Sequence, residues 1–161
     1  MIQRQKESFI VRRLSPGEAG LFRELNQMFS EVFGDEFGDT AYASAKPADA
    51  YLETLLAKPN IIPLVALSGN RIAGGLVAYV LEKFEQERSE VYIYDLAVRE
   101  EYRRRGIARN LILELKKHAQ KAGAWVIYVQ ADKDEADLPA RKLYESLGER
   151  EDVFHYDIAV N

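Results

Sequence analysis

Residues 91–118 decide the fold: they read VYIYDLAV (91–98), REEYRRRGIAR (99–109) and NLILELKKH (110–118). The first part alternates β-branched and aromatic residues, which predicts a strand. The last part repeats apolar residues every three or four positions, which predicts an amphipathic helix. A basic segment that ends at a glycine joins the two. The sequence therefore predicts a strand, a short basic turn and a helix in immediate succession.

The basic turn has the features of an anion-binding site. The first turn of a helix carries N–H groups without intrahelical partners, and its dipole favours negative charge. The small residues Gly106 and Ala108 let the backbone approach a ligand closely. Mobile positive charge around the turn comes from Arg103, Arg104, Arg105 and Arg109.

Two common phosphate motifs, Gly-x-x-x-x-Gly-Lys-Ser/Thr and Gly-x-Gly-x-x-Gly, are both missing from the turn. Its pattern is Arg103-x-x-Gly106-x-Ala108, which resembles the pyrophosphate loop of the GNAT (Gcn5-related N-acetyltransferase) superfamily, Gln/Arg-x-x-Gly-x-Gly/Ala. The strand end before it and the amphipathic helix after it make the match specific. The resemblance implies acetyl-CoA as co-substrate, with its pyrophosphate held by Arg103, Arg104, Arg105, Gly106, Ile107, Ala108 and Arg109.

Composition limits the class of protein. The 161 residues suit a single domain spanning 1–161, and 47% hydrophobic with 30% charged residues is typical of a soluble globule. The chain has no cysteine and only two histidines, so disulfides and thiolate metal sites are excluded and we expect no metal. A net charge of −4 disfavours non-specific nucleic-acid binding and favours a cationic partner.

No apolar run approaches the roughly 18 residues that would span a membrane. The N-terminus lacks the apolar core of a signal peptide. We therefore expect a cytoplasmic protein without a membrane partner.

The remaining sequence predicts a regular series of elements. Ser15, Pro16 and Glu18 predict a capping box with Ser15 as N-cap and Pro16 as the first helical residue, and Gly34 ends that helix. The apolar run 125–130 predicts a strand covered on both faces. The other expected elements are strands at 9–14, 61–67, 72–81 and 153–158, and helices at 47–58 and 138–147. The order β-α-α-β-β-β-α-β-α-β predicts an α+β fold, with a mixed sheet and helices on both faces, and is also the GNAT order.

The resemblance assigns roles to several residues. In GNAT enzymes the strand before the pyrophosphate loop splays from its neighbour, and its backbone holds the pantetheine arm and the thioester carbonyl. The corresponding residues here are Leu96, Ala97 and Val98. A tyrosine in a Tyr-x-x-x-Gly setting is a frequent general acid, which implies this role for Tyr144 before Gly148. A half-buried core tyrosine is the alternative.

Asp95 is the carboxylate most suited to catalysis. Aspartate is depleted in strands, yet Asp95 interrupts a run of β-branched and aromatic residues. It comes one residue before the expected pantetheine-binding backbone. We predict that it acts as general base or as an anchor for the amine, two roles that the sequence does not separate. The alternative is an aspartate paired with a neighbouring strand or loop.

Longer stretches narrow the resemblance to type I aminoglycoside 3-N-acetyltransferases, the gentamicin acetyltransferases. They read FGDEFGD (33–39), AYVLEKFEQ (78–86), RSEVYIYDLAV (88–98) and VIYVQAD (126–132). The resemblance implies direct attack by the drug's 3-amino group in a ternary complex, and hence antibiotic resistance. The loop 132–139 is longer than expected for that family, which could alter the drugs that fit. Residues expected near the cationic acceptor are Asp35, Glu36, Asp39, Glu85, Tyr94, Asp132 and Asp134.

Other functions stay open at this point. The residues by themselves indicate only a cationic acceptor, so a polyamine or a protein lysine is a rival substrate. The acidic stretches at 35–39 and 132–137 are alternatively solvated loops. A non-catalytic acetyl-CoA sensor would keep the basic turn but would not need both Asp95 and Tyr144. A homodimer is compatible with the resemblance, although no sequence feature indicates one.

Overall fold

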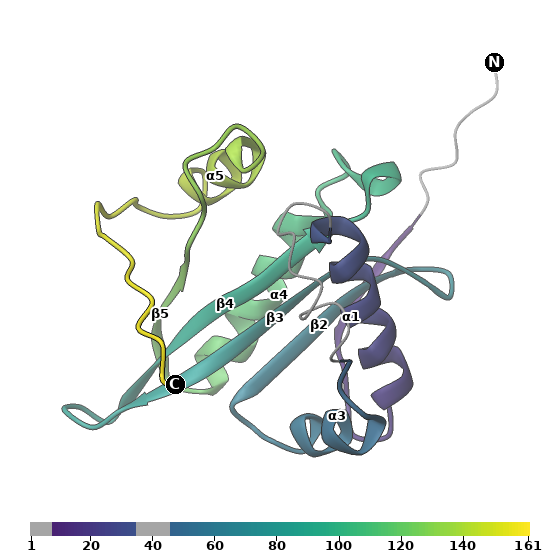
Figure 1. Ribbon diagram of the computed structural model, residues 1–161, viewed down its shortest axis with the longest axis horizontal. Coiled ribbons are helices and arrows are strands. Elements are labelled where there is room, and N and C mark those ends of the chain that lie inside the picture. The colour runs from purple at the N-terminus through teal and green to yellow at the C-terminus, as the bar shows by residue number, and fades with distance from the viewer. Residues whose placement is uncertain (1–7, 35–45) are drawn as a thin grey trace. The chain divides into compact units, whose positions relative to one another are not determined.

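The structure is a computed structural model that describes residues 8–34 and 46–161 (Figure 1). The chain divides into two compact units, residues 1–130 and 131–161. Within the described residues, the first unit contains the sheet and three α-helices, and the second contains one α-helix. No helix in the described ranges is long and apolar enough to cross a membrane.

The first unit is built on a five-stranded sheet with the order β1-β2-β3-β4-β5. Neighbouring strands from β1 to β4 are antiparallel, whereas β5 runs parallel to β4, so the sheet is mixed as predicted. The strands are β1 (Ile10–Arg13), β2 (Ile61–Ser68), β3 (Arg71–Lys83), β4 (Arg88–Val98) and β5 (Ala124–Val129).

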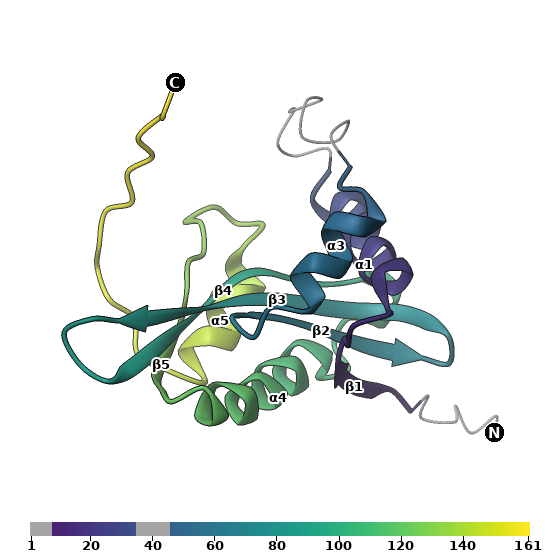
Figure 2. The same ribbon diagram turned by 90° about the horizontal axis from the view of Figure 1, so that it is seen from below.

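Helices cover both faces of this sheet. Figure 2 shows α1 (Ala19–Phe33) and α3 (Asp49–Leu56) on one face and α4 (Ile107–Lys121) on the other. Leu25 and Met28 of α1 are fully buried on the first face, and Leu111 and Leu115 of α4 are fully buried in the core on their side. The second unit contains α5 (Leu138–Glu145). The α+β fold predicted from the sequence, with a mixed sheet and helices on both faces, is confirmed.

The start of α1 differs from the prediction. The helix begins at Ala19 rather than at Pro16, because Gly17 has φ = +92° and a right-handed helix cannot contain that conformation. Half of the capping box still forms, since the Ser15 N–H donates to the Glu18 carboxylate over 2.7 Å. The same carboxylate binds Arg12 of β1, so it fixes the turn that leads into the helix.

Of the two strands predicted near the C-terminus, one is present in the structure and the other is not. The strand predicted at 125–130 is present as β5, but it is half-exposed and Trp125 is 57% exposed, so it is not covered on both faces. The prediction of a strand at 153–158 is wrong, because the structure has no strand in this segment. Phe154 and Ile158 are 86% and 87% exposed, and no described residue pairs with this segment. Alternation alone does not make a strand, because a strand also needs a hydrogen-bonded neighbour.

Close packing of α1 on β3 depends on one glycine. A Cβ at Gly75 would lie 2.2 Å from Leu25 Cδ1 and 3.1 Å from the Leu64 carbonyl oxygen. Leu25 is fully buried, so it has little room to move. The missing side chain at Gly75 therefore sets how closely the helix approaches the sheet.

We predict that Gly75→Ala lowers the free energy of unfolding by about 1–3 kcal/mol, because the added methyl group overpacks the core. Urea denaturation followed by circular dichroism measures the change. The control is Gly20→Ala in α1, where the nearest atom to the new Cβ is 3.9 Å away. It should stabilise by up to about 1 kcal/mol through helix propensity. Equal stability of the two variants would contradict this account of the packing.

Candidate active site

Strand β4 extends past the end of its partner β5. The last pair between them joins Ile93 to Val129, whereas β4 continues to Val98. The backbone of residues 94–98 therefore has no strand neighbour on that side among the described residues. Unpaired N–H and C=O groups along a strand can hydrogen-bond an extended ligand. Leu96, Ala97 and Val98, predicted to hold pantetheine, lie in this free part of β4.

The basic turn follows directly. A short 3₁₀ helix at Glu100–Tyr102 leads into it, and Arg104 and Gly106 then adopt positive φ values of 64° and 77°. The left-handed conformation at Gly106 turns the chain into α4, and no side chain of the described residues caps the first helical turn. The first N–H groups of α4 thus remain available to an anion.

The arginines of the turn brace it and remain exposed. Arg103 Nε donates to the Val98 carbonyl over 3.1 Å, and Arg105 Nη2 donates to the Glu101 carbonyl over 3.0 Å. The Arg105 guanidinium also lies 5.4 Å from the centre of the Tyr102 ring. In contrast, Ile107 is only 3% exposed, so its side chain anchors the helix in the core and only its backbone is offered to a ligand.

A bulge in β4 marks the start of its free part. Val77 of β3 pairs with Asp95, and Ala78 pairs with Ile93, so Tyr94 is an extra residue on β4. Directly opposite residues share a face of a sheet. Val77 belongs to the core under α1 and α3, so Asp95 projects on that face. Tyr94, predicted near the acceptor, is 62% exposed beside it.

The Asp95 carboxyl group is half-buried and has no hydrogen-bond or ionic partner among the described residues. Burial penalises the charged form and raises its pKa from 3.8 to about 6. The alternative, an aspartate paired with a neighbouring strand, is therefore not what the described residues show. A carboxylate with this pKa is ionised at neutral pH and can still accept a proton.

In the second unit, α5 carries Tyr144. Burial and the nearby Asp137 carboxylate raise the pKa of Tyr144 to about 12, so its hydroxyl keeps its proton at neutral pH. In the loop before α5, the Asp134 carboxylate accepts a hydrogen bond from the Asp137 N–H, and the Asp137 carboxylate accepts one from the Asp132 N–H. Asp134 therefore helps to shape the loop, whereas Asp132 is exposed and its carboxylate has no partner within the described chain.

The other predicted residues lie elsewhere. Glu85 sits in the β3–β4 hairpin turn beside Lys83, 3.3 Å away, at the opposite end of β4 from Asp95. Asp35, Glu36 and Asp39 lie outside the described residues. His118 is half-buried near the end of α4, and burial lowers its pKa. The described residues contain no cluster suited to a metal ion.

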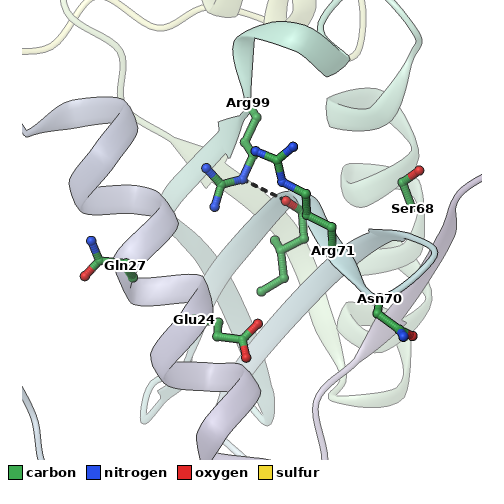
Figure 3. Close-up of a pocket in the computed structure, with 7 residues that line it drawn as sticks. Glu24, Gln27, Ser68, Asn70, Arg71 and Arg99 are labelled. Carbon is green, nitrogen blue, oxygen red and sulfur yellow. Dashed lines mark hydrogen bonds between the residues drawn. The ribbon is translucent and has the colours of Figure 1, made fainter.

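One cavity, of about 430 Å³, lies between α1 and the β2–β3 hairpin (Figure 3). No predicted site residue lines it. Arg99, which sequence reasoning missed, reaches it from the end of β4. Its Nε donates to the Ile72 carbonyl over 2.9 Å, and its Nη1 lies 2.5 Å from Glu31 Oε2. Because the arginine is already neutralised, we interpret it as a clamp that fixes the end of β4 against β3 and α1.

We predict that Asp95→Asn stabilises the protein in a pH-dependent way. Below about pH 4 the carboxyl group is protonated in both folded and unfolded chains, so it has no effect. Between about pH 4 and pH 6 the unfolded chain ionises first, and wild type loses stability; the full cost applies above about pH 6. The variant should be more stable by about 1–3 kcal/mol near pH 7.5 and equal to wild type near pH 4.

Urea denaturation at several pH values measures this difference. The exposed Asp132 offers a matched control, since Asp132→Asn should leave stability within about 0.5 kcal/mol of wild type. A stability difference that does not change between pH 4 and pH 7.5 would show that Asp95 does not carry the burial cost.

Three comparisons bear on identity. Residues 21–148 match the Acetyltransferase (GNAT) family. A comparison with curated protein sequences gives no match. Among solved structures, an aminoglycoside acetyltransferase from an uncultured soil metagenomic sample is 49% identical, with a TM-score of 0.89, and the match covers 96% of this chain and 99% of that one.

Two further structures are informative. A second soil metagenomic aminoglycoside acetyltransferase, in complex with sisomicin, is 33% identical with a TM-score of 0.77, covering 94% of this chain and 97% of that one. An aminoglycoside acetyltransferase with a CoA-containing bisubstrate analogue shares the fold at 17% identity, with a TM-score of 0.71 and coverage of 94% and 99%. With a family match over most of its length, an opened strand and a basic turn at a helix N-terminus, this chain belongs to the GNAT family of acetyltransferases.

Proposed function

We propose that this protein transfers the acetyl group of acetyl-CoA to an amine of an aminoglycoside, by direct attack in a ternary complex. The observation that carries the proposal is the Asp95 carboxylate at the start of the free part of β4, half-buried and without a hydrogen-bond or ionic partner among the described residues. The class of acceptor is supported by two relatives, 49% and 33% identical, that are aminoglycoside acetyltransferases.

The free part of β4 and the basic turn suit acetyl-CoA. An extended pantetheine arm can hydrogen-bond the backbone of Leu96, Ala97 and Val98 as an added strand would. The pyrophosphate can lie at the N-terminus of α4, with Arg103–Arg105 and Arg109 supplying positive charge. The co-substrate brings an acyl group that is already activated as a thioester.

In this mechanism Asp95 would accept a proton from the amine, and Tyr144 would donate a proton to the leaving thiolate. Asp95 takes a proton from the ammonium group, and the neutral nitrogen then attacks the thioester carbonyl carbon. Negative charge develops on the carbonyl oxygen, where a backbone N–H of β4 can stabilise it. The C–S bond breaks, the thiolate takes the Tyr144 hydroxyl proton, and the second proton lost from nitrogen restores Tyr144. One proton leaves Asp95 for solvent in each turnover.

The charge of the protein agrees with a polycationic acceptor. The net charge is −4, and Asp132 offers an exposed carboxylate in the loop before α5. Roles for Asp35, Glu36, Glu85 and Asp134 in substrate binding stay predictions, as does the cytoplasmic location. Modification of the 3-amino group, gentamicin as substrate and a role in resistance rest on the type I resemblance.

A homodimer also stays a prediction. The apolar side chains exposed at 153–160 would provide a surface for one.

A polyamine or a protein lysine is the rival acceptor, because each also supplies a cationic amine. A panel of gentamicin, kanamycin, spermidine and a lysine peptide, with CoA release as readout, separates the two classes. NMR of the product then locates the acetyl group. Binding of acetyl-CoA without turnover on any acceptor would favour a sensor.

We predict that Asp95→Asn lowers kcat/KM for gentamicin by about 10²- to 10⁴-fold, because proton acceptance is lost. The Kd for acetyl-CoA should stay unchanged. In wild type, kcat/KM should rise as the pH increases through about 6, the pKa of Asp95. This rise should be absent from the pH profile of the variant. The exposed Asp152 offers the control Asp152→Asn, with wild-type kinetics expected. Unchanged turnover in Asp95→Asn would rule out Asp95 as the general base. A rise in KM without a change in kcat would instead assign Asp95 as an anchor for the amine.

We predict that Gly106→Ala weakens acetyl-CoA binding about 10-fold, because alanine disfavours φ = +77° and the turn must shift. Isothermal titration calorimetry measures the Kd. Gly123→Ala is a matched control at the other end of α4, with φ = +70° and no atom within 4 Å of the new Cβ. It should cost similar stability and leave the Kd unchanged. Equal affinity in both variants would contradict a role of this turn in binding.

A further inference from the structure

Four tyrosines form a continuous row across three neighbouring strands. Tyr79 of β3 pairs with Tyr92 of β4, and Tyr92 pairs with Tyr128 of β5, so these three share a face of the sheet. Tyr79 packs against the core under α1 and α3, which identifies the face. Tyr94, the extra residue of the bulge, completes what we call the tyrosine row.

Ring contacts hold Tyr94 in a fixed orientation. Its ring meets Tyr79 edge-on with centroids 6.0 Å apart, and meets Tyr92 at 70° with centroids 5.5 Å apart. Tyr92 in turn stacks on Tyr128 at 4.7 Å and 5°, and its hydroxyl donates to Gln130 Oε1 over 2.9 Å. Each contact limits the rotation of the next ring, so the exposed member of the row is preorganised.

Core packing does not account for Tyr94. Its side chain is 62% exposed, whereas Tyr79, Tyr92 and Tyr128 are half-buried. It is adjacent in sequence to Asp95, and the bulge places both at the start of the free part of β4. Tyr94 is thus an exposed aromatic ring in contact with two others, next to a carboxylate that no described residue pairs. This is the composition of a binding surface.

We propose that Tyr94, held by the tyrosine row, stacks against a saccharide ring of the acceptor and thereby selects amino sugars over linear amines. This inference rests on the proposed function. The C–H face of a pyranose or cyclitol ring is apolar and flat enough to cover a tyrosine ring, and nearby ammonium groups gain attraction to the electron-rich ring face. Stacking would hold the ring while Asp95 receives the proton from its amine.

A linear polyamine would gain much less binding free energy from the Tyr94 ring than a saccharide would. It has no ring face, and ordering its chain costs conformational entropy that a rigid ring does not lose. The tyrosine row would therefore provide a preference for saccharides that acidic residues alone would not, because carboxylates attract every cationic amine.

The test compares Tyr94→Leu with Tyr94→Phe. Tyr94→Leu keeps apolar bulk but removes the ring, whereas Tyr94→Phe keeps the ring and loses only the hydroxyl. Phe84→Leu, a change of a fully exposed aromatic residue in the β3–β4 turn, is the control. Gentamicin and spermidine are titrated into the CoA-saturated enzyme by calorimetry. NMR follows the sugar-ring protons, which move upfield when they lie over an aromatic face.

Tyr94→Leu should raise the Kd and KM for gentamicin about 5- to 10-fold and abolish the upfield shifts. The Kd for acetyl-CoA and the values for spermidine should stay unchanged, and Tyr94→Phe and Phe84→Leu should match wild type. If wild type acetylates gentamicin and Tyr94→Leu binds it equally well, the stacking is overturned while the proposed function stands. If wild type acetylates only spermidine or a lysine peptide, the aminoglycoside function and the stacking are both overturned. The acceptor panel gives this result with the wild-type enzyme alone.

Discussion

The register shift between β3 and β4 is the constraint on which the site depends. One extra residue at Tyr94 lets Asp95 lie opposite Val77, on the face that α1 and α3 cover, and the pairing with β5 ends one residue earlier. Without the shift, strict alternation would move every later side chain of β4 to the other face. The bulge therefore sets the face on which the Asp95 carboxylate lies and leaves Tyr94 as the exposed tyrosine, at the point where the pairing with β5 ends.

Much of this arrangement could be predicted from the sequence. The strand–turn–helix at 91–118 has strong periodicity and a glycine with a specific conformational role, so its strand, its left-handed turn and its helix follow from local chemistry. Asp95 could be singled out because aspartate is unusual in a strand. The bulge could not be predicted, because it depends on the register between β3 and β4, which the alternation of residues in the sequence does not encode. For the same reason Tyr92 and Tyr94 could be noticed, but the row with Tyr79 and Tyr128 could not.

The failures have equally physical causes. The helix α1 starts at Ala19 because Gly17 takes a left-handed conformation that the capping-box pattern does not reveal. The segment 153–158 has the alternation of a half-buried strand, yet the described chain supplies no neighbour for it. The position of Glu85 could not be predicted either, because the β3–β4 hairpin places it at the opposite end of β4 from Asp95, and its role in substrate binding stays a prediction. Tertiary pairing, rather than local propensity, decides each case.

The burial of Asp95 links stability to chemistry. An exposed aspartate with a pKa near 3.8 would be too weak a base to hold a proton from an ammonium group, whereas a fully buried one would stay protonated at neutral pH. At the edge of the α1 and α3 core the pKa is about 6, which keeps the group ionised and still basic. The fold bears the cost of that desolvation, and Arg99 helps to keep the strand in place by fixing the end of β4 against β3 and α1. A site built in this way needs a rigid strand rather than a flexible loop, because a small movement of β4 toward solvent would hydrate the carboxylate and return its pKa to the ordinary value.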